Sequence, residues 1–313
     1  MPNNQTKAMT QGAMMIALFL ILVALAFYVP LVNLIAFLVA PLPLAWYSAT
    51  YNRGLSIGVG LVAIVASIFI GNLLIVPLAL ILAIVGLVIG DCLREKKSKI
   101  YLLMATGTAI LITFALQFVL LVRFFDVNFI EESMQLARDT YEQSLEYSAS
   151  LTGGEVQMEE QMKQMFDTME MALPASITLS VFALAFFMVL VILPILKRLR
   201  VEVPKFSPFR DMRLPRAILW YYLIVLSINL FVQPEFGSTF YVVMLNCWMV
   251  LGVLLTLQGI SFIHFVIDAF HYPAFLKVLA TIFAIPMYNF IVLLGIIDLG
   301  FNLREWVKVK SEK

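Results

Sequence analysis

The side chains of this 313-residue chain that could do chemistry are few, and most of them interrupt long apolar runs. A helix of about 20 apolar residues is long enough to cross a bilayer, and a polar side chain at that depth is costly. Contact with a solute would explain such a residue, and so would a hydrogen bond that braces two helices. The candidate residues are Asn72, Gln117, Asn246, Gln258, His264 and Asp268.

His264 and Asp268 are four residues apart and therefore share one face of a helix. This spacing would suit a proton relay; alternatively, the pair marks the cytoplasmic end of a span or braces neighbouring helices. We expect no enzyme activity, cofactor or metal site, because the sequence contains no glycine-rich phosphate loop, HExxH motif or paired-cysteine site. Asp298 lies at the end of an apolar run and is expected at the membrane interface.

Two pairs of small residues could allow a second helix to approach closely. They are Ala13–Ala17 and Gly86–Gly90, and each pair presents its members on one helix face. Packing within the protein is the first interpretation of both pairs. Docking of another protein is the alternative, and it is considered mainly for Ala13–Ala17.

The composition is that of a membrane protein. Hydrophobic residues make up 62% of the chain and charged residues only 13%, about half of what a soluble domain needs to cover its surface. The mean hydropathy is +0.96. A net charge of +1 argues against a nucleic-acid partner. The lipid bilayer is therefore the expected environment.

Apolar runs of spanning length predict an all-α integral membrane protein with eight to nine transmembrane helices. The number depends on the last third. Nine crossings would place a basic tail outside, against the charge rule, whereas eight crossings would leave one late segment re-entrant or in the interface. The runs cover residues 12–29, 31–50, 55–72, 74–92, 100–123, 174–196, 216–233, 239–267 and 275–299.

The distribution of Lys and Arg predicts the orientation. Basic loops follow the fourth and sixth runs, and basic loops stay on the cytoplasmic side. The protein is therefore expected in the bacterial cytoplasmic membrane, with its amino terminus on the cytoplasmic side and the acidic segment 124–173 on the outer side. Apolar residues at helical spacing on both sides of Gly153-Gly154 predict two amphipathic helices joined by a glycine turn.

Three stretches resemble the YybS-like family of bacterial membrane proteins, and the similarity extends nearly from end to end. They are Pro-Phe-Arg-Asp-Met-Arg-Leu-Pro-Arg at 208–216, Leu-Gln-Gly-Ile at 257–260 with His264-Phe265, and Leu-Gly-Ile-Ile-Asp at 294–298.

Within that family, residues 8–196 are similar to the S component of energy-coupling-factor transporters, a six-helix protein with both ends in the cytoplasm. The resemblance implies that the chain captures a small solute at the outer face and passes it to an ATPase-driven module. The first helix of an S component meets the transmembrane coupling (T) subunit through an Ala-xxx-Ala face, and Ala13 and Ala17 occupy the corresponding positions.

We therefore expect an S-component-like domain at 8–196 with the external hairpin 124–173 inserted, a basic cytoplasmic loop at 197–215, and a carboxyl-terminal membrane unit of about three helices with a basic tail at 216–313. The first functional hypothesis is a small-solute-binding or transport-associated protein, with a small hydrophilic solute, a T subunit and its ATPases as partners. The alternative is a scaffold or regulatory protein that binds other envelope proteins through the hairpin and the cytoplasmic loop.

Overall fold

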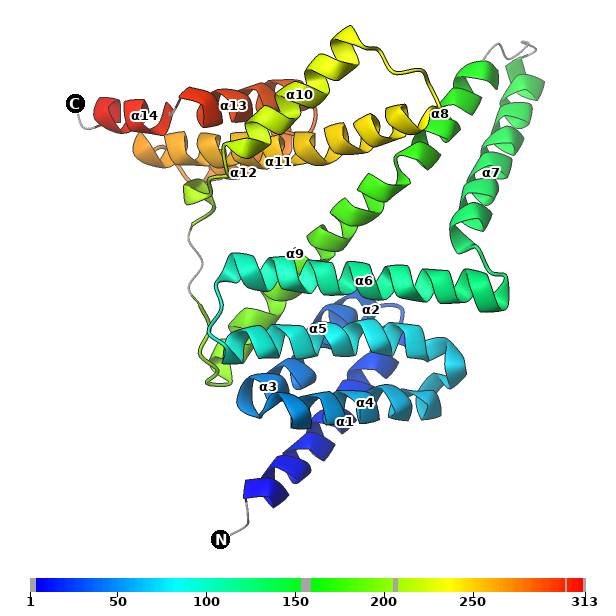
Figure 1. Cartoon of the computed structure of the whole chain (residues 1–313), viewed down its shortest axis with the longest axis vertical. Helices are drawn as coiled ribbons and strands as arrows, with labels where there is room; N and C mark the ends of the chain where they lie inside the picture. The colour runs from blue at the N-terminus through cyan, green and yellow to red at the C-terminus, as the bar shows by residue number, and fades with distance from the viewer. Residues whose placement is uncertain (1–3, 153–158, 205–207, 302, 312–313) are drawn as a thin grey trace. The chain divides into compact units, whose positions relative to one another are not determined.

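A computed structural model describes residues 4–152, 159–204, 208–301 and 303–311. In these residues the regular structure is helical and no strand forms. Six helical stretches of the described residues are long and apolar enough to cross a membrane, with Arg53–Arg94 counted as one, or up to seven if a bent pair counts as one span. This confirms the all-α membrane fold. The chain divides into two compact units, residues 1–133 with 178–205, and residues 134–177 with 206–313 (Figure 1).

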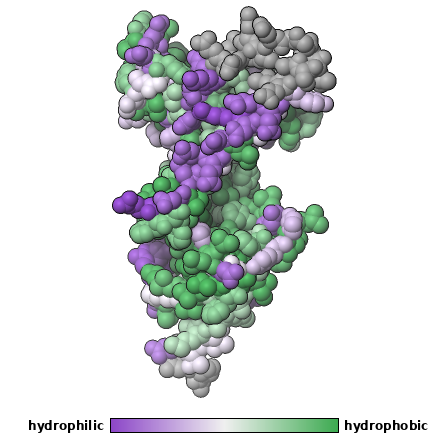
Figure 2. Space-filling view, turned by 90° about the vertical axis from the view of Figure 1, so that its right-hand side faces the viewer, coloured by the Kyte–Doolittle hydropathy of each residue, from purple (hydrophilic) through white to green (hydrophobic). Residues whose placement is uncertain are grey.

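The first unit is built on apolar helices that pack side by side. Figure 2 shows one face of the protein, on which apolar side chains cover much of this unit's surface. Such a surface suits contact with lipid tails. Its helices are α1 (Asn4–Tyr28), α2 (Asn33–Val39), α3 (Leu42–Thr50), α4 (Arg53–Gly71), the 3-10 turn η1 (Asn72–Ile75), α5 (Val76–Arg94) and α6 (Lys99–Phe125), together with most of α9 (Leu173–Arg198).

The apolar stretch Arg53–Arg94 is 42 residues long, but it folds back on itself as two helices of 19 residues each. The reversal begins at Asn72, whose backbone has a positive φ of 59°. The exposed Asn72 therefore serves the turn. Gln117 in α6 donates a hydrogen bond of 2.9 Å to the carbonyl of Pro77 near the start of α5. Both residues thus have a structural role in the described helices.

Gly86 and Gly90 let α5 approach α3 to backbone contact. A Cβ atom added at Gly86 would lie 2.6 Å from the carbonyl oxygen of Pro41. One added at Gly90 would clash with the carbonyl oxygen of Ala45 and would lie 2.5 Å from Cβ of Ser48. This glycine pair therefore packs inside the unit, as the first interpretation expected.

Replacing Gly90 with alanine should therefore destabilise the first unit. The methyl group has no space, and such overpacking costs about 1–3 kcal/mol. We expect Gly90→Ala to lower the thermal unfolding midpoint of the detergent-purified protein. The control is Gly58→Ala in α4, where an added Cβ meets no atom within 4 Å. Equal midpoints for the two variants would contradict this packing.

The second unit packs α11 against α13 in the same way. A Cβ at Gly259 would clash with the carbonyl oxygen of Ile291, and one at Gly295 with that of Leu255. The unit contains most of α7 (Phe129–Thr152), α8 (Glu159–Met171), α10 (Ala217–Phe231), α11 (Thr239–Ala269), α12 (Phe275–Phe283), α13 (Tyr288–Phe301) and α14 (Leu303–Ser311).

The last predicted run, 275–299, is not one straight helix. It divides into α12 and α13, which are bent by 113° at a short break. No residue of α12 is buried. Such a bend fits either a broken span or a re-entrant segment, and the second was one of the alternatives for the last third.

The acidic segment forms α7 and α8, as the apolar spacing predicted, while the Gly153-Gly154 break lies outside the described residues. Arg138 on α7 pairs with Asp167 and Glu170 near the end of α8, at 3.2 Å each. Tyr141 and Phe166 stack edge to face between the two helices. The hairpin therefore packs at least partly on itself.

Candidate functional site

A buried ion pair in the second unit joins α13 to α14. Nη2 of Arg304 lies 2.9 Å from Oδ2 of Asp298, and both side chains are only 2% exposed. The Nε group of Arg304 donates a further hydrogen bond of 3.0 Å to the same oxygen. Asp298, which the sequence placed at the membrane interface, is thus enclosed by protein. A charge withdrawn from solvent to this degree needs a partner of opposite sign.

Two polar residues of α11 extend this pair into a network. Gln258 donates a hydrogen bond of 2.5 Å to Oδ2 of Asp298, and its Oε1 accepts one of 2.9 Å from the backbone N–H of Leu214. Ser261 accepts a hydrogen bond of 3.1 Å from Nη2 of Arg304. The helix spacing i, i+3 places both α11 residues on the face that meets the ion pair.

The network also fixes the loop before α10. Nη1 of Arg304 donates a hydrogen bond of 2.6 Å to the carbonyl of Arg210, and the hydroxyl of Ser261 donates one of 2.8 Å to that of Phe209. The Arg304 guanidinium also lies 5.5 Å from the ring centre of Phe265. Among the described residues, no buried side-chain polar atom lacks a partner. The loop is therefore held by hydrogen bonds to α11 and α14.

A second charged group lies beside this network. The carboxylate of Asp268 forms an ion pair with Arg210, at 2.7 Å, and a second ion pair with Lys277 of α12. His264 instead lies within hydrogen-bond distance of the Lys277 carbonyl, at 3.1 Å, and of the Thr281 hydroxyl, at 3.0 Å. These contacts brace α11 against α12, which is the structural alternative to a proton relay between His264 and Asp268. The group borders a pocket of about 230 Å³.

Asn246 joins the hairpin to α11. Its side-chain amide donates a hydrogen bond of 2.7 Å to the carbonyl of Met171 and accepts one of 2.7 Å from the N–H of Ala175. The amide thereby satisfies backbone groups where α8 ends and α9 begins. Asn246 thus acts as a brace between helices, which was one of the two explanations for a polar residue at this depth.

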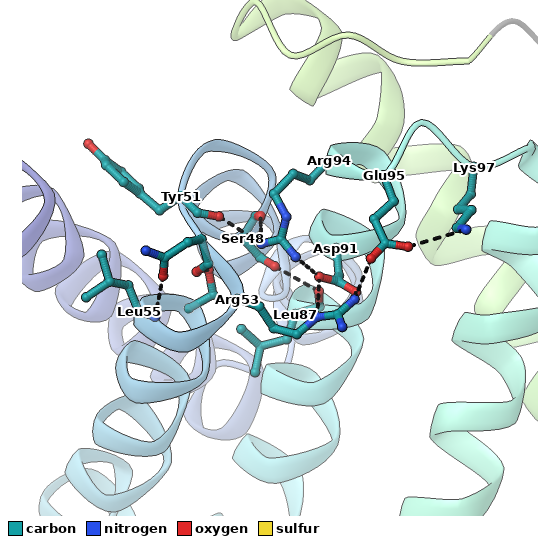
Figure 3. Close-up of polar contacts among 11 residues, drawn as sticks. Ser48, Tyr51, Arg53, Leu55, Leu87, Asp91, Arg94, Glu95 and Lys97 are labelled. Atoms are coloured by element: carbon teal, nitrogen blue, oxygen red, sulfur yellow. Dashed lines mark hydrogen bonds and ion pairs between the residues drawn. The ribbon is translucent and has the colours of Figure 1, made fainter.

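The first unit has its own polar cluster, at the ends of α3 and α5 (Figure 3). Arg53 pairs with Asp91 and Glu95 at 2.6 Å each. Arg94 pairs with Asp91 and points toward the end of α3, where it donates a hydrogen bond of 2.8 Å to the carbonyl of Tyr51. Carbonyl groups at the end of a helix lack partners within it, so Arg94 acts as a cap for α3.

A pocket of about 400 Å³ adjoins this cluster. Glu202 and Lys96 form an ion pair of 2.9 Å at its edge, and the hydrogen bond from Lys96 lowers the pKa of the Glu202 carboxyl. The pocket thus combines charged groups of both signs with aromatic and aliphatic surface. Its lining residues are Trp46, Ala49, Thr50, Leu93, Arg94, Lys96, Leu199, Arg200, Val201 and Glu202.

The comparisons with known proteins assign the chain to a family. A family described as "Predicted membrane protein (DUF2232)" matches residues 17–299. The chain belongs to this family. The uncharacterized protein YybS of Bacillus subtilis (strain 168) is 29% identical over 311 residues, which cover 97% of this chain and 100% of that protein. No solved structure matches the chain.

The three stretches that carried the family resemblance converge on the buried ion pair. The stretch 208–216 supplies the carbonyl of Arg210 and the N–H of Leu214. The other two stretches supply Gln258 and Asp298. Sequence reasoning missed Ser261 and Arg304 as members of the site. Arg304 was grouped with the basic tail, and its only sequence signal is its short distance from Asp298.

Loss of the Arg304 charge should strongly destabilise the second unit. Arg304→Met leaves Asp298 as a buried charge without its partner, which costs about 3–5 kcal/mol. We expect a correspondingly lower free energy of unfolding for the detergent-purified protein in a denaturant titration. The control, Glu305→Gln, changes an exposed charge on the same helix and should stay within about 0.5 kcal/mol of the wild type. Similar values for both variants would show that the charge is not buried in a paired state.

Proposed function

We propose that this protein is a small-solute-binding or transport-associated subunit of the bacterial cytoplasmic membrane that docks on another membrane protein through α1. The observation that supports this proposal is the different use of the two small-residue pairs. Gly86 and Gly90 are buried against α3, whereas Ala13 and Ala17 are exposed on α1. The second pair is therefore available to a helix from outside the unit.

The physical basis is the way helices associate in lipid. Lipid tails are as apolar as leucine, so helices associate through close packing, and small residues allow that packing. Met14, Leu18 and Ile21 are also exposed on α1 and would flank the approaching helix. The resemblance to S components supports a T subunit with its ATPases as the partner. The excess of basic residues in the loops after α5 and α9 supports an amino terminus inside the cell.

The resemblance to S components implies solute capture at the outer face, whereas the pocket of about 400 Å³ in the first unit is lined by the loops after α5 and α9, which we expect on the cytoplasmic side. We therefore propose this pocket as an inner-face site for a small hydrophilic solute. Its volume falls within the usual range of ligand pockets, roughly 300–1,000 Å³. Arg200 and Glu202 offer groups of opposite charge at its edge, and Trp46 offers an aromatic surface. This combination suits a compact polar solute better than a long apolar chain.

The docking surface is tested by substitutions that fill it. We expect the tagged protein, purified gently from its native membrane, to carry a T subunit and its ATPases in quantitative proteomics. Ala13→Leu with Ala17→Leu should reduce that enrichment at least tenfold, because the leucine side chains prevent close helix approach. Ala115→Leu, at an exposed position of α6, is the matched control and should keep the partners. Equal enrichment from all three proteins, or none from the wild type, would contradict the proposal.

The hairpin supports a second candidate function, a scaffold for other envelope proteins. Leu136, Met165 and Met169 are exposed on α7 and α8 among acidic residues, and exposed apolar side chains on a polar hairpin suit a protein partner. The same purification distinguishes the two functions. Partners that are lost when these three residues are changed to serine, but kept in the Ala13→Leu/Ala17→Leu variant, would favour the scaffold.

A further inference from the structure

A small pocket lies where the 208–216 loop enters α10, next to the buried ion pair. Its volume is about 240 Å³. It opens beside a loop whose backbone is fixed by Gln258 and Arg304, so the pocket is held in one shape. The lining residues are Arg213, Leu214, Arg216, Gln258, Asp298 and Leu299.

The polar groups that line the pocket from α11 and α13 are already in use. The side-chain oxygen of Gln258 accepts a hydrogen bond from the N–H of Leu214, and its amide nitrogen donates one to Asp298. The carboxylate of Asp298 is neutralised by Arg304. These groups therefore do not repel an anion as a free carboxylate would, and they do not attract a cation.

The remaining charge at the pocket is positive. Arg213 and Arg216 are both exposed, and neither forms an ion pair with another residue in the part of the chain that the structure describes. Arg210, in the same loop, contrasts with them because it is paired with Asp268. Two guanidinium groups on one small pocket match the oxygen atoms of a phosphate group, to which arginine binds in a bidentate manner.

The start of α10 adds to this positive potential. The helix is 15 residues long and begins at Ala217, and no side chain caps its amino-terminal end. The N–H groups of Ile218 and Leu219 already bond to the carbonyls of Pro215 and Arg216, so the contribution of this end to the binding of an anion is the helix dipole, which favours a negative charge. The helix end supports the site that the two arginines and the pocket define.

We propose that this pocket binds a phosphate group, and that the phosphate of a membrane lipid headgroup is its natural source. Trp220 and Tyr221 are exposed near the start of α10, and aromatic residues of this kind mark the level of the headgroups. Basic pockets between membrane helices are known to hold anionic headgroups. The site is independent of the docking surface on α1 and of the solute pocket in the first unit.

The test is a titration of the full-length protein in detergent with three probes, followed by native mass spectrometry. Dioctanoylphosphatidylglycerol carries the phosphate on a lipid, inorganic phosphate carries it without a lipid, and dioctanoylglycerol carries the lipid without phosphate. Arg213→Gln with Arg216→Gln should weaken binding of the phospholipid roughly 30-fold. Lys197→Gln with Arg198→Gln removes the same amount of charge at exposed positions elsewhere and should change binding less than about twofold.

The pattern across the probes identifies the source of the phosphate. Binding of the phospholipid alone, dependent on Arg213 and Arg216, supports a lipid headgroup. Equal arginine-dependent binding of inorganic phosphate supports the same site with a soluble phosphate compound as its ligand. Arg213→Lys with Arg216→Lys should keep part of the phospholipid binding, because lysine keeps the positive charge but lacks the planar guanidinium group that binds phosphate in a bidentate manner. Unchanged phospholipid binding by the glutamine variant, or an equal loss in the Lys197/Arg198 control, would overturn the proposal.

Discussion

The second unit depends on the neutralisation of one buried charge. Arg304 is held almost completely out of solvent, and its guanidinium must find partners for its donors inside the protein. It finds Asp298 on α13, Ser261 on α11 and the carbonyl of Arg210 in the preceding loop. Segments far apart in the sequence are thereby fixed around one cation. The pocket with Arg213 and Arg216 exists because this network holds the loop that carries them.

The rest of both units relies on close approach of helix backbones. Lipid does not drive apolar helices together, so contact has to come from packing and from internal hydrogen bonds. Gly86 and Gly90 allow it for α3 and α5, and Gly259 and Gly295 allow it for α11 and α13. Polar residues such as Gln117 and Asn246 then satisfy backbone groups near helix ends. Among the described residues, the buried polar side chains thus serve the packing of the helices.

The sequence predicted the membrane class, the helical segments and the amphipathic hairpin, because each depends on local composition and periodicity. It also identified Gly86 and Gly90 as packing residues from their spacing. It did not predict the roles of Asp298 and Arg304, since the partner of a charged residue depends on how α13 and α14 are placed in space. The sequence raised the possibility that a late segment turns back but could not place the bend between α12 and α13, because an apolar run looks the same when it turns back as when it crosses.

The most direct test of the account is a double-mutant cycle between Asp298 and Arg304, with Asp298→Leu, Arg304→Met and the variant that combines them. If the two charges neutralise each other in a buried site, each single variant leaves an unpaired charge and the combined variant leaves none. The combined variant should then lose at least about 2 kcal/mol less stability than the sum of the single losses. Additive losses, with a coupling energy near zero, would contradict the claim that this ion pair organises the second unit.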